Sequence, residues 1–195
     1  MILTILFIFH ILLIMMIWSL FVTMNTHPGE IPLYWGFYIG DDDSKKKRYC
    51  LICNAFKPER SHHCSVCNIC VLNMDHHCPW VDNCIGFYNR KYFMQLLFYV
   101  SILTLYIDAS LAYDFYNILR IVFTERLKYQ QMWISFIIVI SYGLNFTLSI
   151  LITLFLKFHV KLIIENSTTI ESLDKEKIKE NRKVRNKKKK IKNNK

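Results

Sequence analysis

The 195-residue chain is 53% hydrophobic and 15% aromatic, which is apolar for a soluble protein that also has 21% charged residues. The net charge of +10 is local, because residues 174–195 hold 12 Lys or Arg against 3 acids, whereas the rest of the chain holds 13 against 12. A charged tail on a nearly neutral body disfavours a nucleic-acid-binding domain, which would carry a basic face on its folded part.

The first predicted element is a membrane span over residues 1–24. This stretch contains no charged residue, and His10 is its only titratable side chain. A helix needs roughly 20 apolar residues to cross a hydrocarbon core of ~30 Å. A cleaved signal peptide is the alternative, but the stretch lacks a positively charged start and a small-residue cleavage pattern, and it is longer than a typical signal core.

After a linker at 25–48, residues 49–91 are predicted to form a zinc-bound cysteine-rich domain. All seven cysteines lie in it, as one CxxC pair, one CxxCxxC run and two single residues, with four histidines among them. Two residues between cysteines let both thiolates reach one tetrahedral zinc ion. A disulfide framework is not expected, because the number of cysteines is odd and the predicted topology places them in a reducing compartment.

Zinc binding would leave one cysteine over, since two Cys₃His sites use six of the seven. The spacing alone does not identify the remaining one. Cys78 directly follows Asp75, His76 and His77, and a cysteine beside an imidazole that a carboxylate orients is an activated nucleophile. The alternative is that this run completes a zinc cage in a binding module, although the segment has no obvious basic recognition helix.

Two more spans are predicted, at 92–112 and 133–156, with a loop at 113–132 between them and a tail at 157–195. Asp108 is the only charged residue in the first of these spans, and the second has none. Asp108 lies roughly 24 Å along its helix, close to the far interface. Asn145 in the last span is expected to hydrogen-bond a neighbouring helix.

Basic residues flank the spans unevenly, with clusters at 45–48, at 90–91 and throughout the tail. The positive-inside rule therefore places 25–91 and the tail in the cytosol, and 113–132 on the lumenal or extracellular side. The predicted fold class is an α-helical polytopic membrane protein with three spans and a small cytosolic zinc domain. Such a polybasic tail is expected to meet anionic membrane lipids.

The cysteine-rich segment follows the pattern Cys50-x2-Cys53-x3-Lys57-Pro58-x-Arg60-Ser61-x-His63-Cys64-x2-Cys67-x2-Cys70-x4-Asp75-His76-His77-Cys78-Pro79-Trp80-Val81-x-Asn83-Cys84-Ile85-Gly86-x2-Asn89-x3-Phe93. After the third span comes Thr168-Thr169-Ile170-Glu171. The first pattern resembles the cysteine-rich domain of the Asp-His-His-Cys protein S-acyltransferases. The second is similar to the Thr-Thr-x-Glu motif of the same family.

The resemblance implies an enzyme that moves a long-chain acyl group, palmitoyl above all, from acyl-CoA to protein cysteines through an acyl-enzyme on Cys78. His76 would be its general base, Asp75 would polarise His76, and Thr169 would hydrogen-bond Asp75. Two structural zinc ions are implied, one on Cys50, Cys53, His63 and Cys70, the other on Cys64, Cys67, His77 and Cys84. The implied partners are acyl-CoA and cytosolic or membrane proteins with accessible cysteines, with no nucleic acid.

The chain departs from the family pattern at its start. The family has four spans, and His27-Pro28-Gly29 stands where its members show Asp-Pro-Gly after the second span. Either the chain is truncated or it is a three-span form. Two other functions remain open: a zinc-stabilised membrane adaptor without catalysis, and a nucleic-acid-binding finger, which the spans disfavour. The resemblance also implies a location in the endomembranes (Golgi or endoplasmic reticulum) or the plasma membrane.

Overall fold

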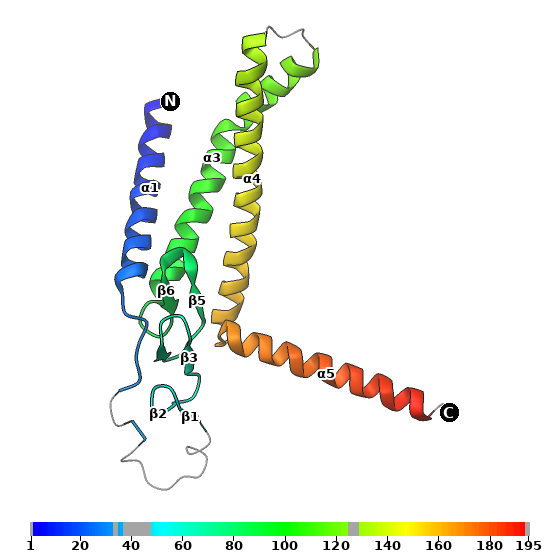
Figure 1. Cartoon of the computed structure of the whole chain (residues 1–195). Coiled ribbons are helices and arrows are strands. Elements are labelled where there is room, and N and C mark those ends of the chain that lie inside the picture. Colours follow the sequence, from blue (N-terminus) through cyan, green and yellow to red (C-terminus); the bar gives the residue numbers. More distant parts are fainter. Residues whose placement is uncertain (1, 33–34, 37–47, 125–128, 194–195) are drawn as a thin grey trace. The chain divides into compact units, whose positions relative to one another are not determined.

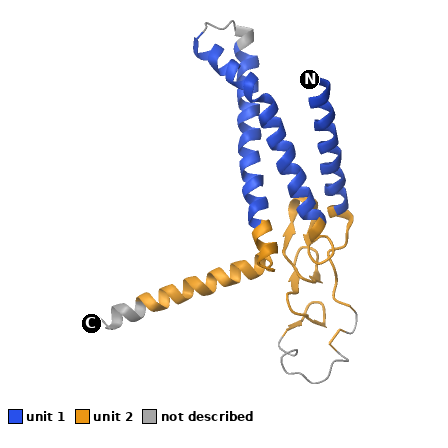
Figure 2. Ribbon diagram, turned by 180° about the vertical axis from the view of Figure 1, so that it is seen from behind, with its two compact units in different colours: residues 1–22, 92–158 blue, residues 23–91, 159–195 orange. Residues whose placement is uncertain are grey.

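The computed structural model of the protein describes residues 2–32, 35–36, 48–124 and 129–193. Two compact units divide the chain, Met1–Val22 with Tyr92–Phe158, and Thr23–Lys91 with His159–Lys195 (Figure 2). The elements along the chain (Figure 1) are α1 (Ile2–Asn25), β1 (Tyr49–Cys50), β2 (Ala55–Phe56), β3 (His62–Cys64), β4 (Ile69–Val71), β5 (His76–Cys78), the 3₁₀ helix η1 (Pro79–Val81), β6 (Asn83–Ile85), α3 (Arg90–Thr124), α4 (Tyr129–Ile164) and α5 (Thr169–Asn193).

Three helices of the described chain, α1, α3 and α4, are long and apolar enough to cross a membrane. The three predicted spans are therefore confirmed as helices of the required length and composition. Both α3 and α4 extend beyond the spans predicted at 92–112 and 133–156, because a helix continues past the hydrocarbon boundary wherever the backbone finds its own hydrogen bonds. Much of the predicted loop is thus helical, and residues 125–128 of it lie outside the described residues.

Polar contacts join the helices within the first unit. Tyr106 on α3 donates a hydrogen bond of 3.1 Å to the Ile5 carbonyl on α1. The Asn145 amide on α4 donates to Asp108 Oδ1 at 2.6 Å and to the Thr104 carbonyl at 3.2 Å, which confirms that it bonds a neighbouring helix. Asp108 itself is buried, a feature that its depth along the helix did not predict. These bonds stabilise the interface between α3 and α4.

The second unit contains three antiparallel hairpins of one form: β1 with β2, β3 with β4, and β5 with β6. Each turn has four residues, and its last residue has a positive φ: 49° at Asn54, 55° at Asn68 and 45° at Asp82. Asn and Asp adopt this left-handed conformation more readily than other side-chain-bearing residues. The hairpins recur every 14 residues, so that Cys50, Cys64 and Cys78 each end the first strand of a hairpin.

The segment that follows α1 packs against these hairpins. The Leu72 N–H donates to the Gly29 carbonyl at 2.9 Å, and the Tyr88 N–H donates to the Pro28 carbonyl at 3.2 Å. At Gly86 a Cβ atom would lie 2.5 Å from Val71 Cγ1 and 2.6 Å from the Pro28 carbonyl oxygen, so only glycine permits this close approach. The hairpins are thereby fixed to the segment around Pro28 and Gly29.

Candidate active site

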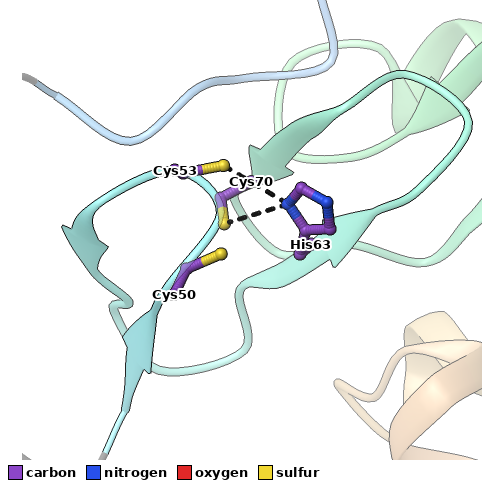
Figure 3. A group of neighbouring side chains, drawn as sticks. All are labelled: Cys50, Cys53, His63 and Cys70. Carbon is purple, nitrogen blue, oxygen red and sulfur yellow. Dashed lines mark hydrogen bonds between the residues drawn. The ribbon is translucent and has the colours of Figure 1, made fainter.

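One group of four side chains joins the first two hairpins. Cys50 and Cys53 come from the first hairpin, and His63 and Cys70 form a cross-strand pair in the second. All four point toward one another (Figure 3). The His63 Nδ1 atom lies 3.3 Å from Cys53 Sγ and 3.8 Å from Cys70 Sγ.

A second group repeats this arrangement 14 residues further along the chain. Cys64 and Cys67 come from the second hairpin, and His77 and Cys84 form a cross-strand pair in the third. The His77 Nδ1 atom lies 3.4 Å from Cys67 Sγ and 3.7 Å from Cys84 Sγ, and the Cys67 and Cys84 sulfur atoms are 3.5 Å apart. Each group therefore ties one hairpin to the next.

Both groups have the composition and spacing of a closed metal site. Each offers three sulfur atoms and one ring nitrogen, all within 4.8 Å of one another, and none of the seven cysteines forms a disulfide. A tetrahedral zinc ion with Zn–S distances of about 2.3 Å and Zn–N distances of about 2.0 Å implies S···N separations of about 3.6 Å, close to those in the structure. The two predicted ligand sets thus come together as two Cys/His clusters that could hold a metal.

Cys78 belongs to neither cluster, although it occupies the same hairpin position as Cys50 and Cys64. Three residues later the third hairpin has Val81, where the first two have a cysteine. The Cys78 side chain is buried, with 6% of the residue exposed. Burial raises the pKa of its thiol, but the nearby His76 imidazole and the Trp80 and Val81 backbone N–H groups outweigh burial and lower that pKa. A lowered pKa increases the fraction of thiolate, which is the nucleophilic form of a cysteine.

His76 lies between Cys78 and the buried carboxylate of Asp75. The His76 Nδ1 atom is 2.8 Å from Asp75 Oδ2, and the ring also hydrogen-bonds Cys78. Burial lowers the pKa of His76, whereas its bonds to Asp75 and Cys78 raise it, to about 9. Burial raises the pKa of Asp75, but His76 and Thr169 lower it to about 2. The three side chains form a continuous thiol, imidazole and carboxylate chain.

Thr169, at the start of α5, supports this chain from the other side. Its backbone N–H donates to Asp75 Oδ1 at 2.9 Å, and its hydroxyl donates to Asp75 Oδ2 at 2.8 Å. The structure therefore contains the contact between Thr169 and Asp75 that the resemblance implies. Arg90 adds a positive charge, with its Nη2 atom 3.7 Å from Asp75 Oδ1 and 2.8 Å from the Ser167 carbonyl that it hydrogen-bonds.

The other two predicted motif residues form a capping box at the N-terminus of α5. The Glu171 carboxylate accepts a hydrogen bond of 2.9 Å from the Thr168 N–H, and the Thr168 hydroxyl accepts one of 3.3 Å from the Glu171 N–H. Arg60, in the cysteine-rich segment, clamps the same carboxylate with two donors at 2.6 Å and 3.0 Å and also bonds Asn166. The helix start is thus fixed to the hairpins, with Thr169 held against Asp75.

Comparison with known proteins decides which family this site belongs to. The sequence pattern of the DHHC palmitoyltransferase family matches residues 43–176. The chain belongs to this family. It is 36% identical over 189 residues to Probable protein S-acyltransferase 13 of Arabidopsis thaliana, covering 86% of this chain and 60% of that protein. It is 33% identical over 199 residues to Palmitoyltransferase ZDHHC20 of Bos taurus, covering 84% of this chain and 51% of that protein.

The alignments cover most of this chain but only part of each relative. The chain spans about half to three-fifths of the length of these two curated relatives. A fungal relative, Palmitoyltransferase PFA3 of Debaryomyces hansenii, is 39% identical over 140 residues, covering 71% of this chain and 33% of that protein. The chain therefore shares the core of the family with these relatives and spans only part of each of them.

Arg60→Ala is expected to loosen the attachment of α5. The variant loses a charge-assisted bidentate contact, which is worth about 1.5–3 kcal/mol. We expect a lower melting temperature in detergent and slower self-acylation, and Arg60→Lys should not restore either property because lysine cannot make the planar fork. Glu59→Ala, at an exposed neighbouring position, is the matched control. An unchanged melting temperature in Arg60→Ala would show that the clamp is dispensable.

Two side chains of this site were not identified from the sequence. In the sequence Arg90 indicates only topology, and His159 on α4 belongs to no recognisable pattern. Arg90 is 15 residues and His159 is 84 residues from Asp75, and the fold brings both to it. The 14-residue spacing of Cys50, Cys64 and Cys78 was a usable signal, because it marks Cys78 as the cysteine whose partner three residues later is missing.

Proposed function

We propose that this protein is a protein S-acyltransferase that transfers a long-chain acyl group, such as palmitoyl, from acyl-CoA to cysteine thiols through an acyl-enzyme on Cys78. The observation that carries this proposal is the chain formed by the buried Cys78, the half-buried His76 and the buried Asp75, which lies outside both Cys/His clusters. An adaptor without catalysis would not require a hydrogen-bonded thiol of lowered pKa at this position.

In the first step the Cys78 thiolate attacks the carbonyl carbon of the acyl-CoA thioester. A bond forms between Cys78 Sγ and this carbon, the bond to the CoA sulfur breaks, and the proton held by His76 passes to the departing CoA thiolate. Asp75 stays ionised and keeps the His76 ring oriented by their 2.8 Å hydrogen bond. The products of this step are CoA and an acyl-enzyme.

In the second step His76, now neutral, removes the proton from the thiol of a substrate protein. The resulting thiolate attacks the acyl carbon, and Cys78 departs as a thiolate beside the newly formed imidazolium. Both steps exchange one thioester for another and are close to isoergic. The enzyme therefore contributes mainly by positioning the groups and by lowering the pKa of the Cys78 thiol.

The two Cys/His clusters are proposed to hold structural zinc ions. The ligand sets have no open position for water or substrate, which is typical of zinc that stabilises a fold. The first cluster joins hairpins one and two, and the second joins hairpins two and three. Because His77 and Cys84 lie on the two strands of the hairpin that carries Cys78, the second cluster would fix the position of the nucleophile.

The membrane helices are proposed to bind the acyl chain. A long acyl chain gains ~0.8 kcal/mol for each CH₂ group that leaves water, and the apolar helices α1, α3 and α4 offer such a surface. The cysteine-rich segment and the tail are proposed to lie in the cytosol, where acyl-CoA and substrate proteins would reach Cys78. The membrane in question would belong to the Golgi, the endoplasmic reticulum or the cell surface.

Self-acylation tests the proposed function. The purified chain should acquire label from a labelled long-chain acyl-CoA, and hydroxylamine should release that label because it cleaves thioesters. Elemental analysis of the same sample should return two zinc ions per chain. A chain that binds two zinc ions but takes up no label would favour the adaptor function over the enzyme.

The polybasic tail is proposed to bind anionic lipids. Residues 174–195 carry 12 basic side chains against 3 acidic ones, and α5 begins next to Asp75. Each basic residue close to an anionic leaflet contributes about 1 kcal/mol. Self-acylation is expected to run several-fold faster in vesicles with phosphatidylserine than in neutral vesicles, and deletion of 182–195 should remove the difference. Equal rates of the intact chain in both lipids would contradict a role for the tail.

A further inference from the structure

A buried histidine on α4 lies against the proposed catalytic pair. His159 has 1% of its surface exposed, and its Nδ1 atom is 3.8 Å from Asp75 Oδ2. Its ring centre lies 5.8 Å from that of His76, with the ring planes inclined by 47°. It therefore contacts both the carboxylate and the imidazole, from a helix that supplies neither of them.

The donors around Asp75 divide between its two oxygens. Oδ1 accepts the Thr169 N–H and faces Arg90, while Oδ2 accepts the Thr169 hydroxyl and meets His76. Oδ2 is thus the oxygen that orients the base, and it is the one that His159 approaches. Because the Nδ1 atom of His76 is directed at Asp75 Oδ2, the Nε2 atom of the same ring is the one that remains for Cys78. A rotation of the His76 ring would therefore break the contact between His76 and Cys78.

We propose that His159 is a positioning residue that holds the His76 ring in the orientation that reaches Cys78. Its imidazole covers the pair from α4, which keeps water away from Oδ2 and limits tilting of the His76 ring. That this positioning serves catalysis rests on the proposed function. The geometric claim, that His159 acts on Cys78 through His76, can be tested without acyl transfer.

A third metal site is the competing explanation, because Asp75, His76 and His159 bring ligand atoms within 4.8 Å of one another. The contacts argue against it. Thr169 and His76 already bond the carboxylate oxygens, and the Arg90 guanidinium lies 3.7 Å from Oδ1, where its charge would repel a cation. Positioning is the role that these contacts support.

The test measures the rate at which iodoacetamide alkylates Cys78, followed by mass spectrometry of the full chain in detergent. His159→Phe keeps the ring volume and removes both nitrogens, and it is expected to slow alkylation about 10- to 100-fold, the scale of a misplaced catalytic group. His159→Gln, which keeps an N–H donor, should recover part of the rate and serves if the Phe variant does not fold. Val160→Ala is the control on the same helix.

Coupling to His76 distinguishes positioning from general support of the fold. In a His76→Ala background, His159→Phe should cause no further loss, because the residue through which it acts is absent. An equal loss in both backgrounds would overturn the proposal. So would a wild-type chain with three metal ions of which His159→Phe loses one. If the variants show the expected coupling but the wild-type chain takes up no acyl label, the proposed function fails and the positioning role stands.

Discussion

Cys78→Ala is expected to abolish self-acylation while leaving the fold and the metal content intact. Without the thiol no acyl-enzyme can form, so the rate should fall by at least about 10³-fold. The metal content should not change, because Cys78 lies outside both clusters of four ligands. Incorporation of labelled acyl-CoA, with metal analysis of the same preparation, measures both quantities.

Two comparisons make this first result interpretable. Cys78→Ser keeps the size of the side chain but offers a hydroxyl with a far higher pKa, so it should be as inactive as the alanine variant. Val66→Ala, at an exposed position in the turn of the second hairpin, should behave as wild type. Loss of a metal ion in Cys78→Ala would mean that Cys78 is a ligand, and the assignment of the nucleophile would then be wrong.

Substitutions of the adjacent histidines His76 and His77 are expected to have different effects. His76→Ala should keep two metal ions and lose about 10²–10⁴-fold in rate, as is typical when a general base is removed. His77→Ala should lose one metal ion and destabilise the third hairpin, because a structural zinc ion contributes folding free energy directly. The two variants therefore separate in metal content and in melting temperature, even where both are inactive.

The comparison of His76→Ala with His77→Ala needs a readout that does not depend on activity. Zinc per chain, measured after gel filtration in detergent, supplies it. His62→Ala is the matched control, since His62 lies in the same segment but in neither cluster. Identical zinc content in both variants would show that the roles of His76 and His77 have been divided wrongly.

The sequence predicted those parts of the site whose residues lie close together in the chain. Two-residue spacings between cysteines predict shared ligands, and three uncharged or nearly uncharged stretches predict spans, because both patterns follow from local geometry. The pairing of Thr169 with Asp75 came from family resemblance alone. Nothing in the intervening residues indicates that the start of α5 returns to the hairpins.

The remaining features depend on the fold. His159 is 84 residues from Asp75 in the sequence, and Arg60 is 111 residues from Glu171. Single polar residues within or beside apolar helices give no sign of their partners, so these contacts could not be assigned from composition or period. The burial of Asp108 could not be predicted either. Its depth along α3 suggested a position at the membrane–water interface. In the structure Asp108 is buried, and its Oδ1 atom accepts a hydrogen bond from the Asn145 amide on α4.

The hairpin repeat places the proposed nucleophile, Cys78, in a turn that matches those of the two Cys/His clusters but lacks their second sulfur. In the first turn the backbone N–H groups of Ile52 and Cys53 help to lower the pKa of Cys50, and in the third those of Trp80 and Val81 help to lower the pKa of Cys78. Under the proposed function, the same backbone turn would prepare one thiolate for a metal ion and another for a thioester carbon. At the position three residues after Cys78, the third hairpin has the isopropyl group of Val81 where the first two hairpins have a sulfur atom.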